Sequence, residues 1–321
     1  MFETNTLLYG ALSLIATTFI FFYTVLVFWS PESIVPSESE KKYLSKRSPK
    51  KPLPLGTIHD QKADVDLTVV IPAYNETSRL PEMFTTTMNH LSSVPKRTYE
   101  ILIVDDGSSD GTSELALKLA SHYPNSDIRV ITLKKNLGKG GAVRHGMLHG
   151  RGRRLLFADA DGASRFEDLE LLWTAMDKVA KDDSAAIAIG SRAHLVKTDA
   201  VVKRSLLRNI LMYGLHTILR IVGVGHIRDT QCGFKLFTRS AARQIFPYQH
   251  LPTWIFDVEL LLIAKQLSIP VEEVPIEWHE VSGSKLNVVT DSLQMLRDLL
   301  ILRANVLLGR WKAAPPRSKH Q

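Results

Sequence analysis

The chain has 321 residues, of which 45% are hydrophobic and 23% are charged, as in a globular protein of one or two domains. Its formal net charge of +7 suggests anionic partners, and nucleic acid, lipid headgroups and phosphorylated substrates are the candidates. We expect no nucleic-acid partner, because the basic residues are not interleaved with clustered aromatic ones. The single cysteine, Cys232, excludes an intramolecular disulfide and favours a reducing compartment.

The first predicted element, residues 1–29, is a membrane anchor. Leu7 to Trp29 carries no charge and would extend about 34 Å as a helix, enough to cross a ~30 Å hydrocarbon core. A cleaved signal peptide fits less well, because Glu3 and no basic residue precedes the apolar run. Basic residues follow it: Lys41, Lys42, Lys46, Arg47, Lys50 and Lys51. This bias predicts a single-pass protein whose C-terminal bulk lies in the cytosol.

Residues 30–65 are rich in proline, serine and lysine. This composition predicts a basic linker between the anchor and the folded domain. The basic cluster could also contact anionic lipid.

Residues 66–285 are predicted to form a catalytic domain of the α/β class. Short apolar strands alternate with amphipathic helices, which indicates a Rossmann-like, mostly parallel sheet flanked by helices. The expected strands are 67–71, 99–104, 128–133, 153–158 and 185–190, and the expected helices are 76–91, 112–122 and 139–150.

Two later segments, 206–223 and 288–311, are apolar but contain charged residues. A charge at the bilayer centre costs about 2.5–3.5 kcal/mol, which disfavours a second span. We expect amphipathic helices that lie in the membrane interface or close an acceptor groove, although ordinary core helices are equally compatible with the pattern. Residues 286–321 would thus form a membrane-proximal helix and tail.

Two carboxylates, Asp159 and Asp161, directly follow the apolar run 153–158. If that run is a buried strand, both acids lie at its carboxyl end, where open α/β sheets bind ligands. Mg²⁺ or Mn²⁺ is commonly held by one or two carboxylates together with substrate phosphates. The pair therefore predicts a divalent-metal site beside a diphosphate.

Three further motifs lie where predicted strands or helices end or begin. Residues 69–76 offer an aromatic ring and an acid, and residues 104–108 offer carboxylates for base N–H groups or ribose hydroxyls. Residues 137–142 form a glycine-rich helix start with a lysine, which favours phosphate.

Together these motifs resemble family 2 of the GT-A glycosyltransferases, from Asp66 to Trp278. Residues 228–235 and 254–259 are similar to the polyprenyl-phosphate glycosyltransferases of that family. The resemblance implies a GT-A fold and a nucleotide-sugar site. The implied contacts to the nucleotide sugar are Pro72, Tyr74, Glu76, Asp105, Asp106, Lys139 and Asp159, with Asp159 and Asp161 on Mg²⁺ or Mn²⁺. Related enzymes often have a glutamine where this chain has Ala163, so the ion and its third protein ligand stay open.

The resemblance also implies the reaction, an inverting transfer of glucose from UDP-glucose to dolichyl phosphate at the endoplasmic reticulum membrane. A phosphate monoester has a second pKa near 6, so this acceptor needs no base to deprotonate it. Cations should instead surround its phosphate. The candidates are Arg192, Arg204, Arg208 and Lys235, together with Ser284 and Lys285, which lie on a Ser-Gly loop. Asp229, Gln231 and Asp257 are expected, with Asp161, in the catalytic centre, orienting glucose or a cationic partner.

Two alternatives remain open from the sequence. GDP-mannose or another UDP-sugar could replace UDP-glucose, with a dolichyl or other polyprenyl phosphate as the acceptor. The chain could also be an inactive, membrane-tethered module that only binds a nucleotide sugar, although the intact acid pair argues against this.

Overall fold

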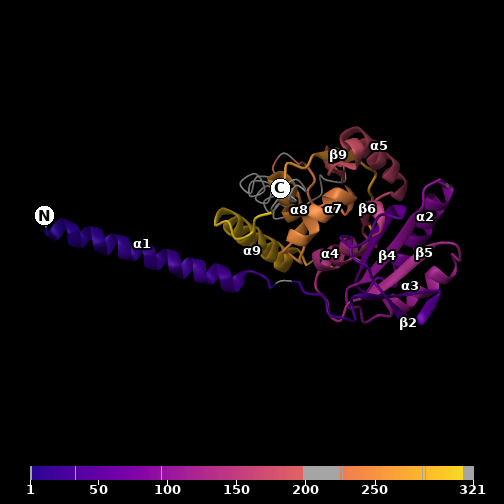
Figure 1. Cartoon of the computed structure of the whole chain (residues 1–321), viewed down its shortest axis with the longest axis horizontal. Coiled ribbons are helices and arrows are strands. Elements are labelled where there is room, and N and C mark those ends of the chain that lie inside the picture. Colours follow the sequence, from indigo (N-terminus) through magenta and orange to yellow (C-terminus); the bar gives the residue numbers. More distant parts are fainter. Residues whose placement is uncertain are drawn as a thin grey trace.

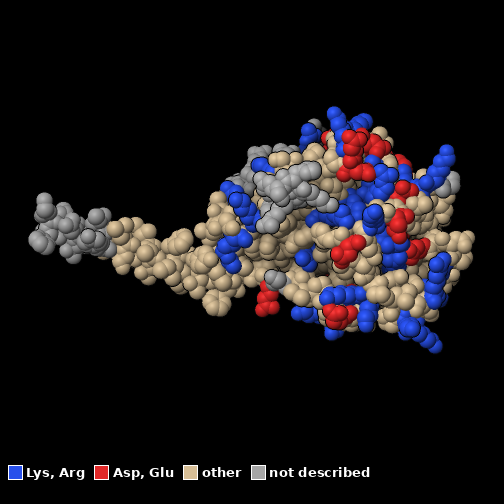
Figure 2. Space-filling model, in the orientation of Figure 1, with Lys and Arg blue, Asp and Glu red and all other residues tan. Residues whose placement is uncertain are grey.

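The computed structural model describes residues 2–32, 34–94, 96–197, 225, 227–283, 285 and 287–313. The first helix, α1 (Phe2–Trp29), projects away from a compact α/β body (Figure 1). Its segment Leu12–Trp29 has a mean hydropathy of 2.0 and is long and apolar enough to cross a membrane. Figure 2 shows no charged side chain on the part of this helix that it colours, whereas both signs of charge cover the body. The predicted apolar helix is therefore present.

One mixed sheet forms the centre of the body, in the order β2-β1-β5-β4-β3-β6-β8-β7-β9. The strands are β1 (Lys42–Ser45), β2 (Ser48–Pro54), β3 (Val65–Ala73), β4 (Tyr99–Asp105), β5 (Asp127–Thr132), β6 (Gly152–Ala158), β7 (Ile187–Ser191), β8 (Phe234–Thr238) and β9 (Val271–Pro275). The five strands predicted from the sequence all form, as β3 to β7. The β5-β4-β3-β6 part is parallel, as predicted.

The antiparallel strand β8 was not expected. It lies between β6 and β7 and pairs with both, Phe157 facing Lys235 and Ile187 facing Phe237. Strand β9 then adds in parallel to β7. The insertion of β8 matters for the site, because it brings the residues just before β8 against the carboxyl end of β6.

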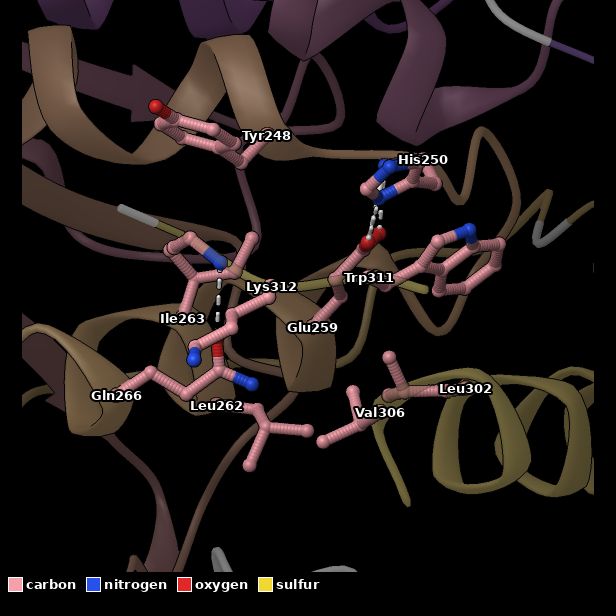
Figure 3. Close-up of a pocket in the computed structure, with 11 residues that line it drawn as sticks. Tyr248, His250, Glu259, Leu262, Ile263, Gln266, Leu302, Val306, Trp311 and Lys312 are labelled. Carbon is pink, nitrogen blue, oxygen red and sulfur yellow. Dashed lines mark hydrogen bonds and ion pairs between the residues drawn. The ribbon is translucent and has the colours of Figure 1, made fainter. Parts of the chain in front are cut away.

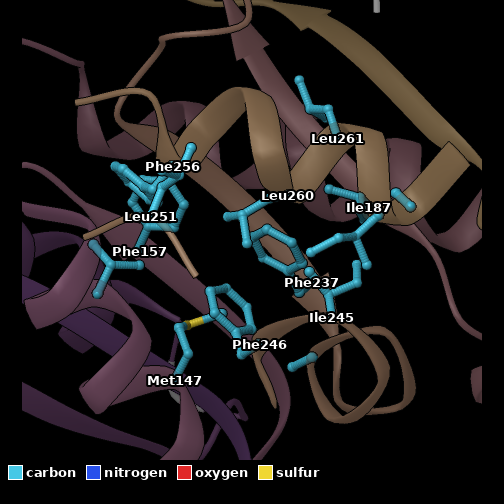
Figure 4. Packing of buried hydrophobic residues seen from close by; sticks show 14 of the residues in the cluster. Met147, Phe157, Ile187, Phe237, Ile245, Phe246, Leu251, Phe256, Leu260 and Leu261 are labelled. Carbon is cyan, nitrogen blue, oxygen red and sulfur yellow. The ribbon is translucent and has the colours of Figure 1, made fainter. Parts of the chain in front are cut away.

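Helices cover both faces of the sheet. They are α2 (Leu80–Ser93), α3 (Thr112–Ser121), α4 (Lys139–His149), α5 (Leu169–Val179), α7 (Arg239–Ile245), α8 (Phe256–Gln266) and α9 (Val288–Leu307). Alternating strand residues face opposite sides: Val70 packs with α4, α7 and α8, while Val69 and Ile71 pack with α2 and α5. Figure 4 shows the first cluster, in which Phe157, Phe237, Phe246 and Phe256 lie together.

Residues 30–65 do not form the predicted tether. Strands β1 and β2 make a hairpin, and β1 pairs antiparallel with β5, so that the sheet begins in this segment. Arg239, which is buried, donates to the backbone carbonyls of Ile58 and Gln61. The segment binds to the body largely through its own main-chain groups, which its proline- and lysine-rich composition does not reveal.

The amphipathic helix predicted over 288–311 is present as α9. It lies against α1, and between them is an apolar groove of about 440 Å³. The side chains of Asn305 and Ser30 are hydrogen-bonded at 3.0 Å where the two helices meet. The other predicted amphipathic segment, 206–223, lies outside the described residues.

Two histidines of α4 contact backbone carbonyls of residues 30–65. The His145 ring nitrogen Nε2 lies 2.8 Å from the Glu40 carbonyl oxygen, and Nδ1 of His149 lies 2.8 Å from that of Gly56. Burial, together with the neighbouring His149, lowers the pKa of His145 to about 4. The folded protein therefore holds this ring neutral.

We expect the free energy of unfolding to fall as the pH drops from about 6.5 to about 4. In this range His145 binds a proton in the unfolded chain but stays neutral in the folded one. The loss from His145 should reach about 2–3 kcal/mol near pH 4.5. Chemical unfolding in detergent at pH 7 and pH 4.5 measures it. His145→Gln should flatten the dependence, and the exposed His122→Gln should not. An unchanged pH dependence in His145→Gln would disprove this role of His145.

Candidate functional site

Asp159 is the first residue after β6 and stands at the carboxyl end of the parallel strands. Its backbone N–H donates to the Gly233 carbonyl at 3.1 Å, which fixes it against the segment that enters β8. The Lys139 ammonium lies 2.7 Å from one carboxylate oxygen and 2.9 Å from the other. Both side chains are partly exposed, so water screens this ion pair less than a fully exposed one.

Gly233 owes its identity to this close approach. A Cβ atom at position 233 would lie 1.9 Å from Oδ2 of Asp159 and 2.2 Å from its carboxyl carbon. Any side chain there would therefore displace the carboxylate or the strand.

Asp161 lies two residues further on, beside Arg79. Its Oδ1 accepts from the Ala163 N–H at 3.0 Å, and its Oδ2 is 3.8 Å from the Arg79 guanidinium. Burial and the neighbouring Asp159 raise the pKa of Asp161 above its ordinary value. A divalent cation between the two acids would relieve their mutual repulsion.

Lys139 is the first residue of α4, and several nearby carboxylates act on its charge. Burial lowers the pKa of Lys139, but Asp159, Asp257 and Asp161 outweigh burial and raise it, so the side chain is charged. Its ammonium lies 6.0 Å from the centre of the Trp254 ring. The lysine thus provides a permanent positive charge at the start of a helix, a position that favours phosphate.

The loop after β3 contains two of the predicted nucleotide-sugar contacts, Tyr74 and Glu76. Tyr74 is 38% exposed, whereas Glu76 is buried and receives two hydrogen bonds from Arg79, at 2.7 and 2.5 Å. Lys285 crosses this loop: its ammonium donates to the carbonyls of Tyr74 and Asn75 and lies 2.9 Å from the Glu76 carboxylate. Lys285 is thus engaged with the loop itself rather than standing free for an acceptor phosphate. Pro72 lies within β3, one residue before its end.

Asp105 and Asp106 both make structural hydrogen bonds. Asp105 accepts from the Ser108 N–H and the Ser113 hydroxyl. Asp106 accepts from the N–H groups of Leu137, at 2.7 Å, and Gly138, at 2.9 Å, just before Lys139. Burial raises the pKa of Asp106 to about 7 despite these hydrogen bonds. The pair shapes the edge of the site, and Asp106 fixes the entry into α4.

Arg192 and Asp229 form a bidentate ion pair with nitrogen–oxygen distances of 2.7 and 2.8 Å. Burial raises the pKa of Asp229, but the hydrogen bonds and charge of Arg192 outweigh it, so the pKa lies below its ordinary value. Arg192 keeps part of its surface exposed and stands 5.4 Å from the centre of the Trp278 ring. It remains able to meet a ligand phosphate.

The position of Lys235 argues against its predicted contact with an acceptor phosphate. Its side chain is 0% exposed, and its ammonium bonds to Asp257, at 2.5 Å, and to the Cys232 carbonyl, at 2.6 Å. The residue lies inside β8, whose place between two strands the sequence alone did not reveal. Asp257, correspondingly, has a cationic partner and does not face an open cleft.

The remaining predicted residues separate into two groups. Gln231 lies in the described part of the chain, and its amide contacts the Met295 sulfur of α9 at 3.9 Å. Arg204, Arg208 and Ser284 lie outside the described residues.

The donor set fits a divalent metal that also takes ligands from substrate and water. Among the described residues, no group of three or more histidine, cysteine or acidic side chains is arranged to hold a metal. Asp159 and Asp161 supply two carboxylates at one strand end, and hard cations bind such pairs together with phosphate oxygens. The sequence reasoning missed Arg79 here; its position three residues after Glu76, at the start of α2, was the available signal.

Comparisons with known proteins agree with this architecture. The sequence profile of Glycosyl transferase family 2 matches residues 68–246. The "Dolichyl-phosphate beta-glucosyltransferase" of Saccharomyces cerevisiae is 49% identical over 263 residues, covering 79% of each chain. The human protein of the same name is 46% identical over 280 residues, covering 86% of this chain and 85% of its own.

Among solved structures, the glucosyl-3-phosphoglycerate synthase of Mycobacterium tuberculosis has the same fold. Its complex with UDP gives a TM-score of 0.51 at 16% identity and covers 79% of this chain and 86% of its own. Another structure of that enzyme contains Mn²⁺, UDP-glucose and phosphoglyceric acid and gives a TM-score of 0.50, over 78% of this chain and 85% of its own.

The mixed sheet and the profile match define a glycosyltransferase with a GT-A-like fold. The chain belongs to glycosyltransferase family 2 and, within it, to the family of the dolichyl-phosphate β-glucosyltransferases.

We expect Gly233→Ala to lower glycosyl transfer at least about tenfold, because the added Cβ would overlap the Asp159 carboxylate. Turnover per folded molecule, with folding checked by thermal unfolding, measures the effect. Gly10→Ala is the matched control, since a Cβ there meets no atom within 4 Å. Full activity of Gly233→Ala would show that the position of Asp159 is not constrained in this way.

Proposed function

We propose that this chain transfers glucose from UDP-glucose to dolichyl phosphate and releases UDP, with inversion at the sugar carbon. The observation that carries the proposal is the ion pair between Asp159 and Lys139 at the carboxyl end of β6, in a chain of this family. The names of the relatives supply the sugar and the lipid, and the neighbouring fold with bound UDP-glucose supports the donor nucleotide.

The donor diphosphate would lie between the acid pair and the start of α4. Mg²⁺ or Mn²⁺ would be held by Asp159 and Asp161 and would neutralise the charge that develops on the departing diphosphate. The neighbouring acids raise the pKa of Lys139, so its charged ammonium could pair with a phosphate oxygen in place of Asp159. Tyr74, with its exposed ring, would stack on the base, and Lys285 would hold the base-binding loop closed.

The acceptor attacks without help from a base in the protein. Its phosphate is largely dianionic at neutral pH, so the task of the enzyme is to position it and balance its charge. Arg192 is held by Asp229 and remains partly exposed, so it could meet the acceptor phosphate. We keep Arg204, Arg208 and Ser284 as further candidates and assign Lys235 to the support of Asp257 instead.

The membrane location follows from the same proposal. The segment Leu12–Trp29 would anchor the chain in the endoplasmic reticulum membrane, with the glycosyltransferase domain on the cytosolic side. Helix α9, packed against α1, would then lie where the lipid acceptor leaves the bilayer.

Membranes that contain this chain, dolichyl phosphate and Mn²⁺ or Mg²⁺ test the function directly. We expect label from UDP-glucose, and not from GDP-mannose, to enter the lipid phase, and EDTA to stop it. Asp159→Asn and Asp161→Asn should each lower turnover by roughly 10²-fold or more, because the metal and its charge are lost. Labelled lipid only from GDP-mannose would disprove the donor, and no labelled lipid from any sugar nucleotide would favour a binding module.

Lys139→Gln should raise the KM for UDP-glucose about tenfold or more, with a smaller effect on the KM for dolichyl phosphate, since only the diphosphate would lose a cation. Steady-state kinetics with each substrate varied in turn measure the difference. Arg144→Gln, which changes a cation on the same helix that bonds to the Phe246 carbonyl instead, is the control. An unchanged KM for UDP-glucose in Lys139→Gln would exclude the lysine from the donor site.

A further inference from the structure

Helix α9 presents different residues to the membrane anchor and to the catalytic domain. Leu293, Leu296 and Leu300 are exposed and line the apolar groove against α1. Met295 and Asp298 lie on the opposite side, because two residues correspond to about 200° around an α-helix. The same helix therefore meets both the apolar anchor and the catalytic domain.

Asp298 makes the polar contact of the inner side. It is only 2% exposed although it belongs to an amphipathic surface helix. The Thr253 hydroxyl donates to its Oδ2 at 2.5 Å, and the neighbouring Arg297 donates to its Oδ1 at 2.8 and 3.0 Å. A buried carboxylate with a hydroxyl donor from another segment fixes the two elements relative to each other.

The segment that contains Thr253 packs directly on the start of α4. The Pro252 carbonyl accepts from the Gly141 N–H at 3.1 Å. A Cβ at Gly138 would lie 2.6 Å from the same oxygen, so the two backbones are in close contact. Lys139 and the Trp254 ring, at 6.0 Å, belong to these two touching segments.

The residues that follow α9 also contact the body. Figure 3 shows the Trp311 ring beside His250, whose ring bonds to Glu259. The rings of Trp311 and His250 are stacked, with centres 4.3 Å apart and planes inclined by 4°. The Ala313 N–H donates to the Gln266 side chain at 3.2 Å. These contacts hold the tail against α8, and the Thr253–Asp298 hydrogen bond connects the middle of α9 to the segment beside the donor site.

We propose that Thr253 and Asp298 are positioning residues through which α9, seated against the membrane anchor, sets the place of Lys139 and Trp254 in the donor site. This inference rests on the proposed function, because it assumes that Lys139 binds the donor diphosphate. Neither residue touches substrate; both act through the 252–254 segment. If α9 moved away from the anchor, the 252–254 segment would loosen and the affinity for the donor would fall. The enzyme should therefore bind the donor most tightly when α9 is packed against the membrane anchor.

The test uses the full chain in lipid nanodiscs and the variants Thr253→Val, Thr253→Ser and Asp298→Ala. Thr253→Val keeps the shape and removes the hydroxyl, and Thr253→Ser restores it. Two quantities are measured: the Kd for UDP in Mn²⁺, and the KM values for UDP-glucose and dolichyl phosphate. Arg297→Gln is the matched control, because it removes a charge and a partner of Asp298 without touching Thr253.

We expect Thr253→Val and Asp298→Ala each to raise the Kd for UDP and the KM for UDP-glucose about fivefold or more, and the double variant to be no worse than the poorer single one. Thr253→Ser and Arg297→Gln should stay within about twofold of the unchanged chain, as should the KM for dolichyl phosphate in every variant.

Three results would overturn the inference: an unchanged Kd for UDP in Thr253→Val, a Thr253→Ser variant as impaired as Thr253→Val, or an equal loss in Arg297→Gln. A variant that simply folds poorly would lose kcat and active fraction without the selective rise in the Kd for UDP, and this also counts against it. If UDP binding falls as expected but no glucose reaches dolichyl phosphate, the inference stands and the proposed acceptor fails. If the unchanged chain does not bind UDP, both fail.

Discussion

The structure depends on the balance of charge at the carboxyl edge of its parallel strands. Asp159 and Asp161, which are partly exposed, lie there with the buried Glu76, an arrangement that is unfavourable for ionised acids alone. Lys139 and Arg79 supply the compensating charges. Because each cation comes from the start of a different helix, the edge is formed only when α4, α2 and β6 are all in place.

This balance supports the proposed binding of a metal and a diphosphate at the site. A ligand of this kind brings both signs of charge, so it can take over the partners that the acids and cations have in the ligand-free protein. The charged side chains are already in place, so we expect little reorganisation in the proposed reaction. Other acids near the site are also paired with cations. Asp229 orients Arg192, and Asp257 is paired with Lys235.

Strands β3 to β6 were predictable because each is a short apolar run that ends in polar residues, and the pairing of such runs in βαβ units follows general rules. The place of β8 was not predictable, since its pairing depends on contacts with strands distant in the sequence. Lys235 was misplaced for this reason: a lysine beside a motif looks free until its strand is known to be central. The β1–β2 hairpin escaped notice because Pro49, Pro52 and neighbouring lysines suppress the alternation typical of strands.

The central claim is that Asp159 and Asp161 together bind the metal that holds the nucleotide. Anomalous diffraction at the manganese edge, from crystals soaked with Mn²⁺ and UDP, tests it most directly. We expect one strong peak within coordination distance of both carboxylates and of the UDP diphosphate, with the Lys139 ammonium moved from Asp159 to a phosphate oxygen. A peak elsewhere, or bound UDP with no metal at these acids, would contradict it.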